Sequence, residues 1–175
     1  VFNLKNDTNE LNFLIKSYNH ILDSFAIFHL PEIIKSRDKG KINSFIDFVQ
    51  TKYQKITHTY FQNYLNYTTA HLQFVSRIEN MQELYNTYIH EKPFLYNHPA
   101  YMDFFNDFYN SFIYQYSQKI PLKDLDLNIS QNPNSFALLD SLGKDPLLKD
   151  EVVREMVLIK NLTQMYYNHL YSNYG

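Results

Sequence analysis

Histidines and carboxylates are the side chains of this sequence that could bind a metal ion or transfer protons. Two histidines four residues apart with a glutamate between them would indicate a helical zinc site, and Glu-x-x-His pairs on two helices would indicate a di-iron site. Neither pattern occurs, so we predict no metal site and no cofactor, and interpret the histidines as surface or hydrogen-bonded residues. The seven are His20, His29, His58, His71, His90, His98 and His169.

Paired carboxylates are the next candidates for acid–base chemistry. Three pairs lie four residues apart, so that each pair shares one face of a helix. They are Asp103 with Asp107, Glu79 with Glu83, and Glu151 with Glu155. An acid–base couple needs a pocket that drives the two pKa values apart, and the sequence indicates none. We interpret the pairs as solvated surface, and Arg154 is expected to pair with Asp150.

Composition excludes several classes of function. The absence of cysteine leaves no thiolate nucleophile, and the three glycines form neither a nucleophile elbow nor a phosphate-binding loop. With 16 basic and 18 acidic residues and no basic block, the chain is not expected to bind nucleic acid. We recognise no signal peptide and no membrane-spanning segment. We therefore predict no catalytic residue, and no enzyme activity in this chain.

Helical periodicity runs through the first half of the chain. A first helix is predicted from Asn9 to His29, ended by Pro31, although residues 31–35 could add a turn. After a charged turn, residues 36–41, the pattern predicts a helix from Ile42 or Ser44 through Tyr67. Thr68 and Thr69 could then mark a bend before the pattern continues to Ile78. Asn80 could cap a shorter helix that ends before Pro93.

The segment 93–117 carries the densest aromatic pattern. Pro99 is typical of a helix start, with Asn97 or His98 as the cap. Apolar residues then continue on helical spacing to Tyr116, over most of the circumference. A helix that is apolar on nearly all sides is packed on more than one side, so we expect this helix to be central.

The C-terminal third begins with a predicted loop over residues 121–134. Asn132 and Pro133 predict the start of a short helix through Leu142, with Gly143 as its stop. Asp145 and Pro146 predict another start, followed by a helix from Leu147 or Asp150 to Tyr171. Its expected inner face is Leu148, Val152, Met156, Ile159, Thr163, Tyr166 and Leu170, and the residues that broaden this face are Val153, Val157, Leu158 and Met165. Together these patterns predict an all-α fold, an irregular bundle of about five to seven helices joined by short loops. Residues 1–175 are expected to form a single helical domain, cut from a longer protein.

Two segments resemble motifs of a known family. Residues 96–109, YNHPAYMDFFNDFY, are similar to an NxPAYMxFFNxFF pattern. Residues 141–160, SLGKDPLLKDEVVREMVLIK, are similar to an LGxDPLLxNxxxRELVLLK pattern. The two occur in this order in the helical region that precedes the thioredoxin-like domain of TlpA-like thiol-disulfide oxidoreductase family envelope proteins of Bacteroidetes. The matched segments cover about a fifth of the chain.

The resemblance implies a periplasmic or lipid-anchored parent with a Cys-x-x-Cys site farther along the chain. This chain would then be a non-catalytic accessory domain that positions the redox domain or binds its client. Its partner would be a C-terminal thioredoxin-like domain of the same protein, or a client protein. The alternative is a free-standing module that binds a peptide, glycan or protein in an aromatic groove. The motif positions with an architectural role would be Asn97, Pro99, Tyr101, Gly143, Asp145, Pro146, Arg154 and Glu155.

Overall fold

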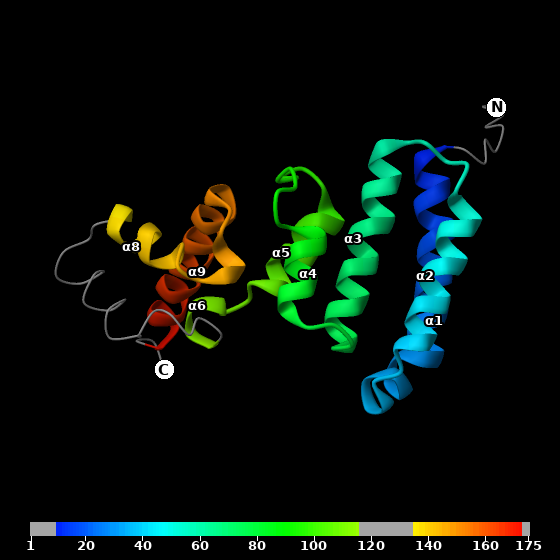
Figure 1. The fold of residues 1–175 in the computed structure, drawn as a ribbon, viewed down its shortest axis with the longest axis horizontal. Coiled ribbons are helices and arrows are strands. Elements are labelled where there is room, and N and C mark those ends of the chain that lie inside the picture. Colours follow the sequence, from blue (N-terminus) through cyan, green and yellow to red (C-terminus); the bar gives the residue numbers. More distant parts are fainter. Residues whose placement is uncertain (1–9, 116–134, 173–175) are drawn as a thin grey trace. The chain divides into compact units, whose positions relative to one another are not determined.

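The computed structural model describes residues 10–115 and 135–172. Every regular element in these two ranges is a helix and neither contains a β-strand, which confirms the predicted all-α fold (Figure 1). The chain divides into two compact units, one of Val1–Asn80 with Leu95–Phe104 and the other of Met81–Phe94 with Phe105–Gly175. A single domain over residues 1–175 stays a prediction, and the predicted loop at residues 121–134 lies outside the described ranges.

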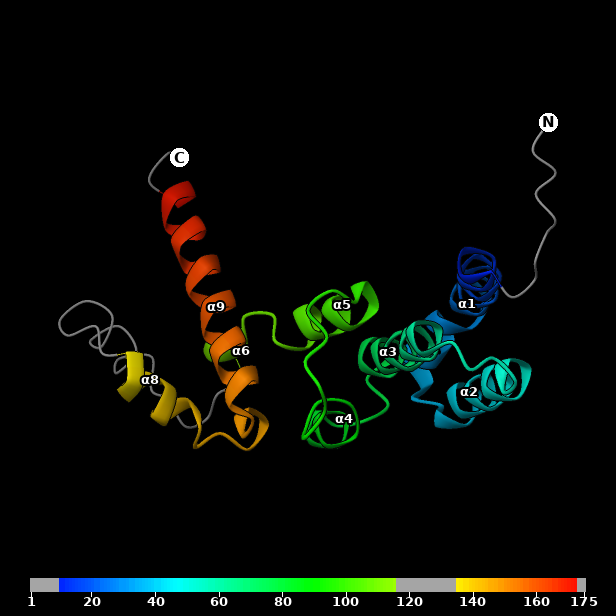
Figure 2. The ribbon, with the colours of Figure 1, turned by 90° about the horizontal axis from the view of Figure 1, so that it is seen from above.

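Three long helices build the first unit. They are α1 (Leu11–Ser36), α2 (Lys39–Tyr53) and α3 (Thr59–Ser76), and α1 packs against both of the others (Figures 1 and 2). Tyr18 is fully buried at the centre, where its ring meets Tyr53 and Tyr64 edge-on at centroid distances of 6.2 and 5.9 Å. Its hydroxyl lies 2.8 Å from Oγ1 of Thr68 on α3. The core therefore combines aromatic packing with internally satisfied polar groups.

The predicted end of the first helix at Pro31 is wrong. Helix α1 continues through Pro31 to Ser36, and Arg37 ends it in a left-handed conformation, φ 58°, with its N–H 2.7 Å from the carbonyl oxygen of Ile33. Proline removes one backbone hydrogen bond from a helix. Ile33 is completely buried one half-turn later, so the continued helix gains a core side chain that offsets that loss.

The break between the second and third helices lies earlier in the chain than the predicted bend at Thr68 and Thr69. The predicted helix through Tyr67 is two helices, because α2 ends at Tyr53 and α3 begins at Thr59. Thr68, expected to mark a bend, lies inside α3 and donates its hydroxyl to the carbonyl of Tyr64 at 2.7 Å. The turn at residues 54–58 brings Tyr53 and Phe61 to a ring-centroid distance of 5.1 Å. Packing across the turn therefore outweighs the continuous periodicity.

The second unit combines several short helices with one long helix, α9. They are α4 (Met81–Tyr88), α6 (Phe112–Gln115), α8 (Ser135–Leu142), the 3-10 helix η1 (Pro146–Leu148) and α9 (Glu151–Ser172). Helix η1 packs against both α4 and α9, and α9 also packs against α6 and α8. The short element η1 is therefore the point where the first and last helices of this unit are joined.

The predicted central helix is shorter than expected. Helix α5 (Pro99–Phe108) begins at the predicted proline, but a left-handed residue, Ser111 at φ 52°, separates it from α6. A non-glycine residue with positive φ cannot continue a right-handed helix. The interruption lets Tyr109 donate its buried hydroxyl to the carbonyl of Leu147 at 2.7 Å, so a tertiary hydrogen bond ends the helix.

The buried face of α9 is centred on residues that were expected only to broaden it. Val153, Val157 and Leu158 are buried, whereas the expected inner residues Val152, Ile159 and Tyr166 are 41, 57 and 64 % exposed. Asn161 explains the rotation, because it is 1 % exposed and accepts the N–H of Ile113 with its side-chain oxygen at 3.3 Å. A hydropathy pattern does not assign an amide side chain to the inner face of a helix. The centre of the predicted apolar stripe therefore lies one residue away from the centre of the observed buried face.

Candidate functional site

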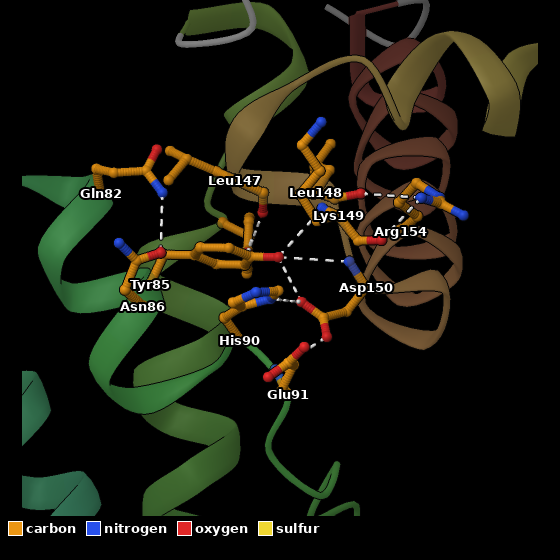
Figure 3. A network of polar contacts seen from close by, with 11 residues as sticks. Gln82, Tyr85, Asn86, His90, Glu91, Leu147, Leu148, Lys149, Asp150 and Arg154 are labelled. Atoms are coloured by element: carbon orange, nitrogen blue, oxygen red, sulfur yellow. Dashed lines mark hydrogen bonds and ion pairs between the residues drawn. The ribbon is translucent and has the colours of Figure 1, made fainter.

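The densest polar cluster joins α4 to the start of α9 within the second unit. Its centre is Asp150, the residue before α9, and its other members are Tyr85 on α4 and His90 in the turn that follows (Figure 3). Glu91 lies in the same turn with a left-handed φ of 55°. Between 59 and 65 residues of sequence separate the partners on the two sides, so only the fold brings them together.

Five hydrogen-bonded contacts converge on the Asp150 carboxylate and the Tyr85 hydroxyl. Tyr85 donates its hydroxyl to Oδ2 of Asp150, and Nδ1 of His90 lies 3.0 Å from the same oxygen. The backbone N–H of Glu91 donates to Oδ1 at 3.0 Å. The Tyr85 hydroxyl in turn accepts the backbone N–H groups of Lys149 at 3.1 Å and of Asp150 at 3.4 Å. Both carboxylate oxygens and the phenol are thus fully engaged.

The environment keeps Asp150 ionised and Tyr85 neutral. Burial opposes ionisation of Asp150, but the hydrogen bonds from Tyr85, His90 and Glu91 outweigh it and lower the pKa of Asp150 below its ordinary value. Burial, together with the adjacent carboxylate, raises the pKa of Tyr85 far above that of free tyrosine. An ionised carboxylate only accepts hydrogen bonds, so His90 carries a proton on Nδ1.

The contact between Asp150 and His90 resembles two of the three members of a catalytic triad, the carboxylate and the histidine. A carboxylate that orients a histidine through Nδ1 is the supporting part of an Asp–His pair, and the pair needs a nucleophile at Nε2. Within residues 10–115 and 135–172, no hydroxyl, thiol or amine is hydrogen-bonded to Nε2 of His90. Tyr85 directs its hydroxyl to the Asp150 carboxylate instead. The hydrogen bonds of Tyr85, His90 and Asp150 connect α4 and the following turn to the start of α9, and we call this cluster the polar staple.

Sequence patterns do not predict this cluster, because none of them relates residues on α4 to the start of α9. No sequence pattern pairs Tyr85 with Asp150: the histidines, His90 among them, are interpreted as surface or hydrogen-bonded residues, and Asp150 is expected to pair with Arg154. The pairing of Arg154 with Asp150 is wrong, because the Arg154 guanidinium donates to the carbonyls of Leu148 and Lys149 at 3.2 and 3.0 Å. A helix-periodic sequence predicts contacts three or four residues apart, and contacts across sixty residues are outside its reach.

The motif positions before and within α5 have different environments. Pro99 is the exposed first residue of α5, and Asn97 is exposed two residues earlier. Tyr101 is 1 % exposed, and its ring meets Tyr67 edge-on at 4.8 Å. His98, at the cap position, is 5 % exposed and directs Nε2 toward the carbonyl of Tyr60 at 3.1 Å. Tyr101 and His98 thus pack α5 onto α3.

The motif positions around η1 form a tight turn. Asp145 is buried and accepts the N–H of Leu147 with its side chain at 2.9 Å, and Pro146 is the first residue of η1. A Cβ atom built on Gly143 would lie 2.9 Å from Nη1 of Arg154. Gly143 has no positive φ, so close approach to Arg154 explains the glycine better than helix stopping does. Glu155 is exposed on α9.

We expect Arg154→Ala to lower the free energy of unfolding by about 1–2 kcal/mol, because two hydrogen bonds from a charged donor are lost. Gly143→Ala should lower it by about 1 kcal/mol, since the new methyl group displaces the guanidinium. In the Arg154→Ala background the same glycine substitution should become neutral. Urea unfolding of the four proteins measures this coupling.

Glu155→Ala is the matched control for this cycle, because Glu155 is exposed next to Arg154. Its unfolding midpoint should match that of the parent protein. Additive effects of the two substitutions would contradict a contact between Gly143 and Arg154.

The remaining candidate residues do not gather into a site. No cluster of three or more metal-ligating side chains occurs in the described part of the chain. Asp103, Asp107, Glu151 and Glu155 are exposed, as expected of solvated surface. Glu79, in the turn after α3, forms an ion pair with Lys39 at 3.0 Å, which connects that turn to the start of α2. No helix in these ranges combines the length and apolar character needed to cross a bilayer.

A groove in the first unit lies between α1 and α2. It encloses about 550 Å³. Phe25 and Phe45 stack at 4.1 Å between ring centroids along its wall, and Phe48 lies beside them with 52 % of its surface exposed. The polar lining residues are His29, Asp38, Lys41 and Ser44. The volume falls in the range of small-ligand and side-chain pockets.

The described residues form an all-helical fold that contains the polar staple of Tyr85, His90 and Asp150 and the groove between α1 and α2. Comparison with protein-family models, with curated proteins and with solved structures found no match.

Proposed function

We propose that this chain is a non-catalytic helical accessory region of a cell-envelope thioredoxin-like protein of the TlpA-like group, from a member of the Bacteroidetes. In this role it positions the redox domain or holds the client of that domain in the periplasm. The observation that carries the proposal is the pair of motif-like segments, residues 96–109 and 141–160, in the order found in that group. These segments supply the start of α5 and the η1–α9 turn.

The chemistry of the second unit supports a structural role. Asp150, Tyr85 and His90 engage one another and the backbone, and Arg154 engages carbonyl oxygens. Each of these four side chains makes at least one hydrogen bond within the unit. The motif residues therefore serve helix starts, turns and packing, which is the role that an accessory region requires of them.

Sequencing the gene beyond the codon for Gly175 is the direct test of the redox link. A β-rich continuation with Cys-x-x-Cys before a helix would support the proposal, and a stop codon there would overturn it. In a longer protein, deleting residues 1–175 should leave the reduction of a small disulfide dye unchanged while slowing the reduction of a protein client. Equal effects on both substrates would contradict an accessory role.

The groove between α1 and α2 favours a second candidate function. A free-standing module could take an aromatic side chain of a peptide between Phe25, Phe45 and Phe48. Ser44→Phe would fill the groove and should abolish such binding without unfolding the protein. Binding that survives this substitution would exclude the groove as the peptide site.

A further inference from the structure

The end of the α1–α2 hairpin in the first unit carries an unusual outer surface. Ile27 and Phe28 are 71 and 76 % exposed, and Ile34 is 41 % exposed. Helical spacing places Ile27 and Ile34 on the side of α1 opposite the buried Tyr18. A helix that is apolar on its outer side as well as its inner side is expected to contact something besides its own core.

A basic turn follows this apolar segment directly. Lys35, Arg37, Lys39 and Lys41 fall within seven residues, and the acid among them, Asp38, accepts backbone N–H groups from Gly40 and Lys41 as the cap of α2. Lys41 pairs with Glu32 at 2.5 Å and Lys39 with Glu79 at 3.0 Å. Four cations against three carboxylates leave a net charge of +1 here, in a chain whose net charge is −2.

One exposed ring and one cation lie along the same line of α1. Phe28 and Lys35 are seven residues apart, which is two turns of α1, so the cation lies along the helix from the exposed ring. Arg37 keeps its charge while donating Nη1 to the carbonyl of Ser76 at 2.9 Å. A bulky apolar face bordered by Lys and Arg is the surface chemistry of segments that rest in a lipid headgroup layer.

We propose that this end of the hairpin docks on an anionic lipid surface. Ile27, Phe28 and Ile34 enter the headgroup layer, and the cations of residues 35–41 contact lipid phosphates. Nucleic acid fits the surface less well, because four cations are a small footprint and exposed aliphatic side chains do not recognise phosphates. The docking is independent of a redox parent and goes beyond the accessory role.

Vesicle co-sedimentation of the 175-residue chain tests the proposal. Binding is expected to vesicles of phosphatidylcholine with about 30 % phosphatidylglycerol, to be weak on phosphatidylcholine alone, and to fall with added salt. Phe28→Ser and Lys35→Glu should each lower the partition coefficient by about fivefold or more. Both side chains are exposed, so the circular dichroism and melting temperature should stay at the parent values.

Two matched controls separate the surface from general effects. Phe136 is 82 % exposed on α8, so Phe136→Ser removes an exposed ring elsewhere. Lys144→Glu changes the net charge as Lys35→Glu does, at an exposed turn of the second unit. Both controls should bind as the parent does. No binding by the parent chain, or equal loss in controls and test variants, would overturn the proposal. Self-association that Phe28→Ser abolishes, without vesicle binding, would assign the face to a second copy instead and also overturn it.

Discussion

Replacing Asp150 by alanine is expected to lower the free energy of unfolding by about 3 kcal/mol, a larger effect than most single substitutions have. The carboxylate accepts three hydrogen bonds, from Tyr85, His90 and the backbone of Glu91. Its removal also leaves the Tyr85 hydroxyl without its acceptor. Water does not readily replace that acceptor, because Tyr85 is only 1 % exposed. Urea unfolding followed by tyrosine fluorescence measures the change.

The same substitution should alter the response to acid. The folded-state pKa of Asp150 lies below its unfolded value, so its contribution is complete above about pH 4 and is lost as pH falls through the folded pKa. The difference in stability between the parent and Asp150→Ala should therefore shrink below about pH 4. A difference that stays constant down to pH 2 would show that the carboxylate is not the stabilising form.

Two variants serve as controls for Asp150→Ala. Asp150→Asn keeps the size and one acceptor oxygen, so its cost should be intermediate. Glu151→Ala changes the next residue, which is exposed, and should cost about 0.5 kcal/mol through the helix dipole. A Glu151→Ala effect equal to that of Asp150→Ala would mean that the acidic start of α9, and not the staple, stabilises the unit.

Replacing Ile33 by alanine should lower the free energy of unfolding by about 3 kcal/mol, within the range for deleting a buried isoleucine side chain. Ile33 has no exposed surface and follows Pro31 inside α1. Its burial is what holds α1 helical past the proline. Differential scanning calorimetry and far-ultraviolet circular dichroism should show a lower melting temperature and some loss of helix.

The neighbouring residue provides the control for this prediction. Ile34 is the same residue type in the same helical turn but is 41 % exposed, so Ile34→Ala should cost less than about 1 kcal/mol. Equal losses in the two variants would show that helix propensity, and not burial, determines the effect. An unchanged melting temperature for Ile33→Ala would contradict the account of how α1 passes Pro31.

Two positions, Pro31 and Ser111, show where local sequence rules fail to predict the helix ends. The proline at position 31 was expected to end a helix because its local cost is known, while the burial of Ile33 depends on α2 and α3. Ser111 in a left-handed conformation divides α5 from α6, although residues 99–116 keep helical spacing. Local rules weigh what a residue does to its own turn, and distant packing can outweigh them.

The amino-acid sequence by itself determined the all-α fold, because apolar side chains recur on helical spacing and glycines are few. It also placed helix starts at Pro99 and near Asp145 and Pro146, since proline and capping side chains act on their own turn. Only the tertiary structure decided which face of α9 is buried, where α2 ends, and that Tyr85, His90 and Asp150 meet. Those outcomes depend on contacts across tens of residues, which no local periodicity carries.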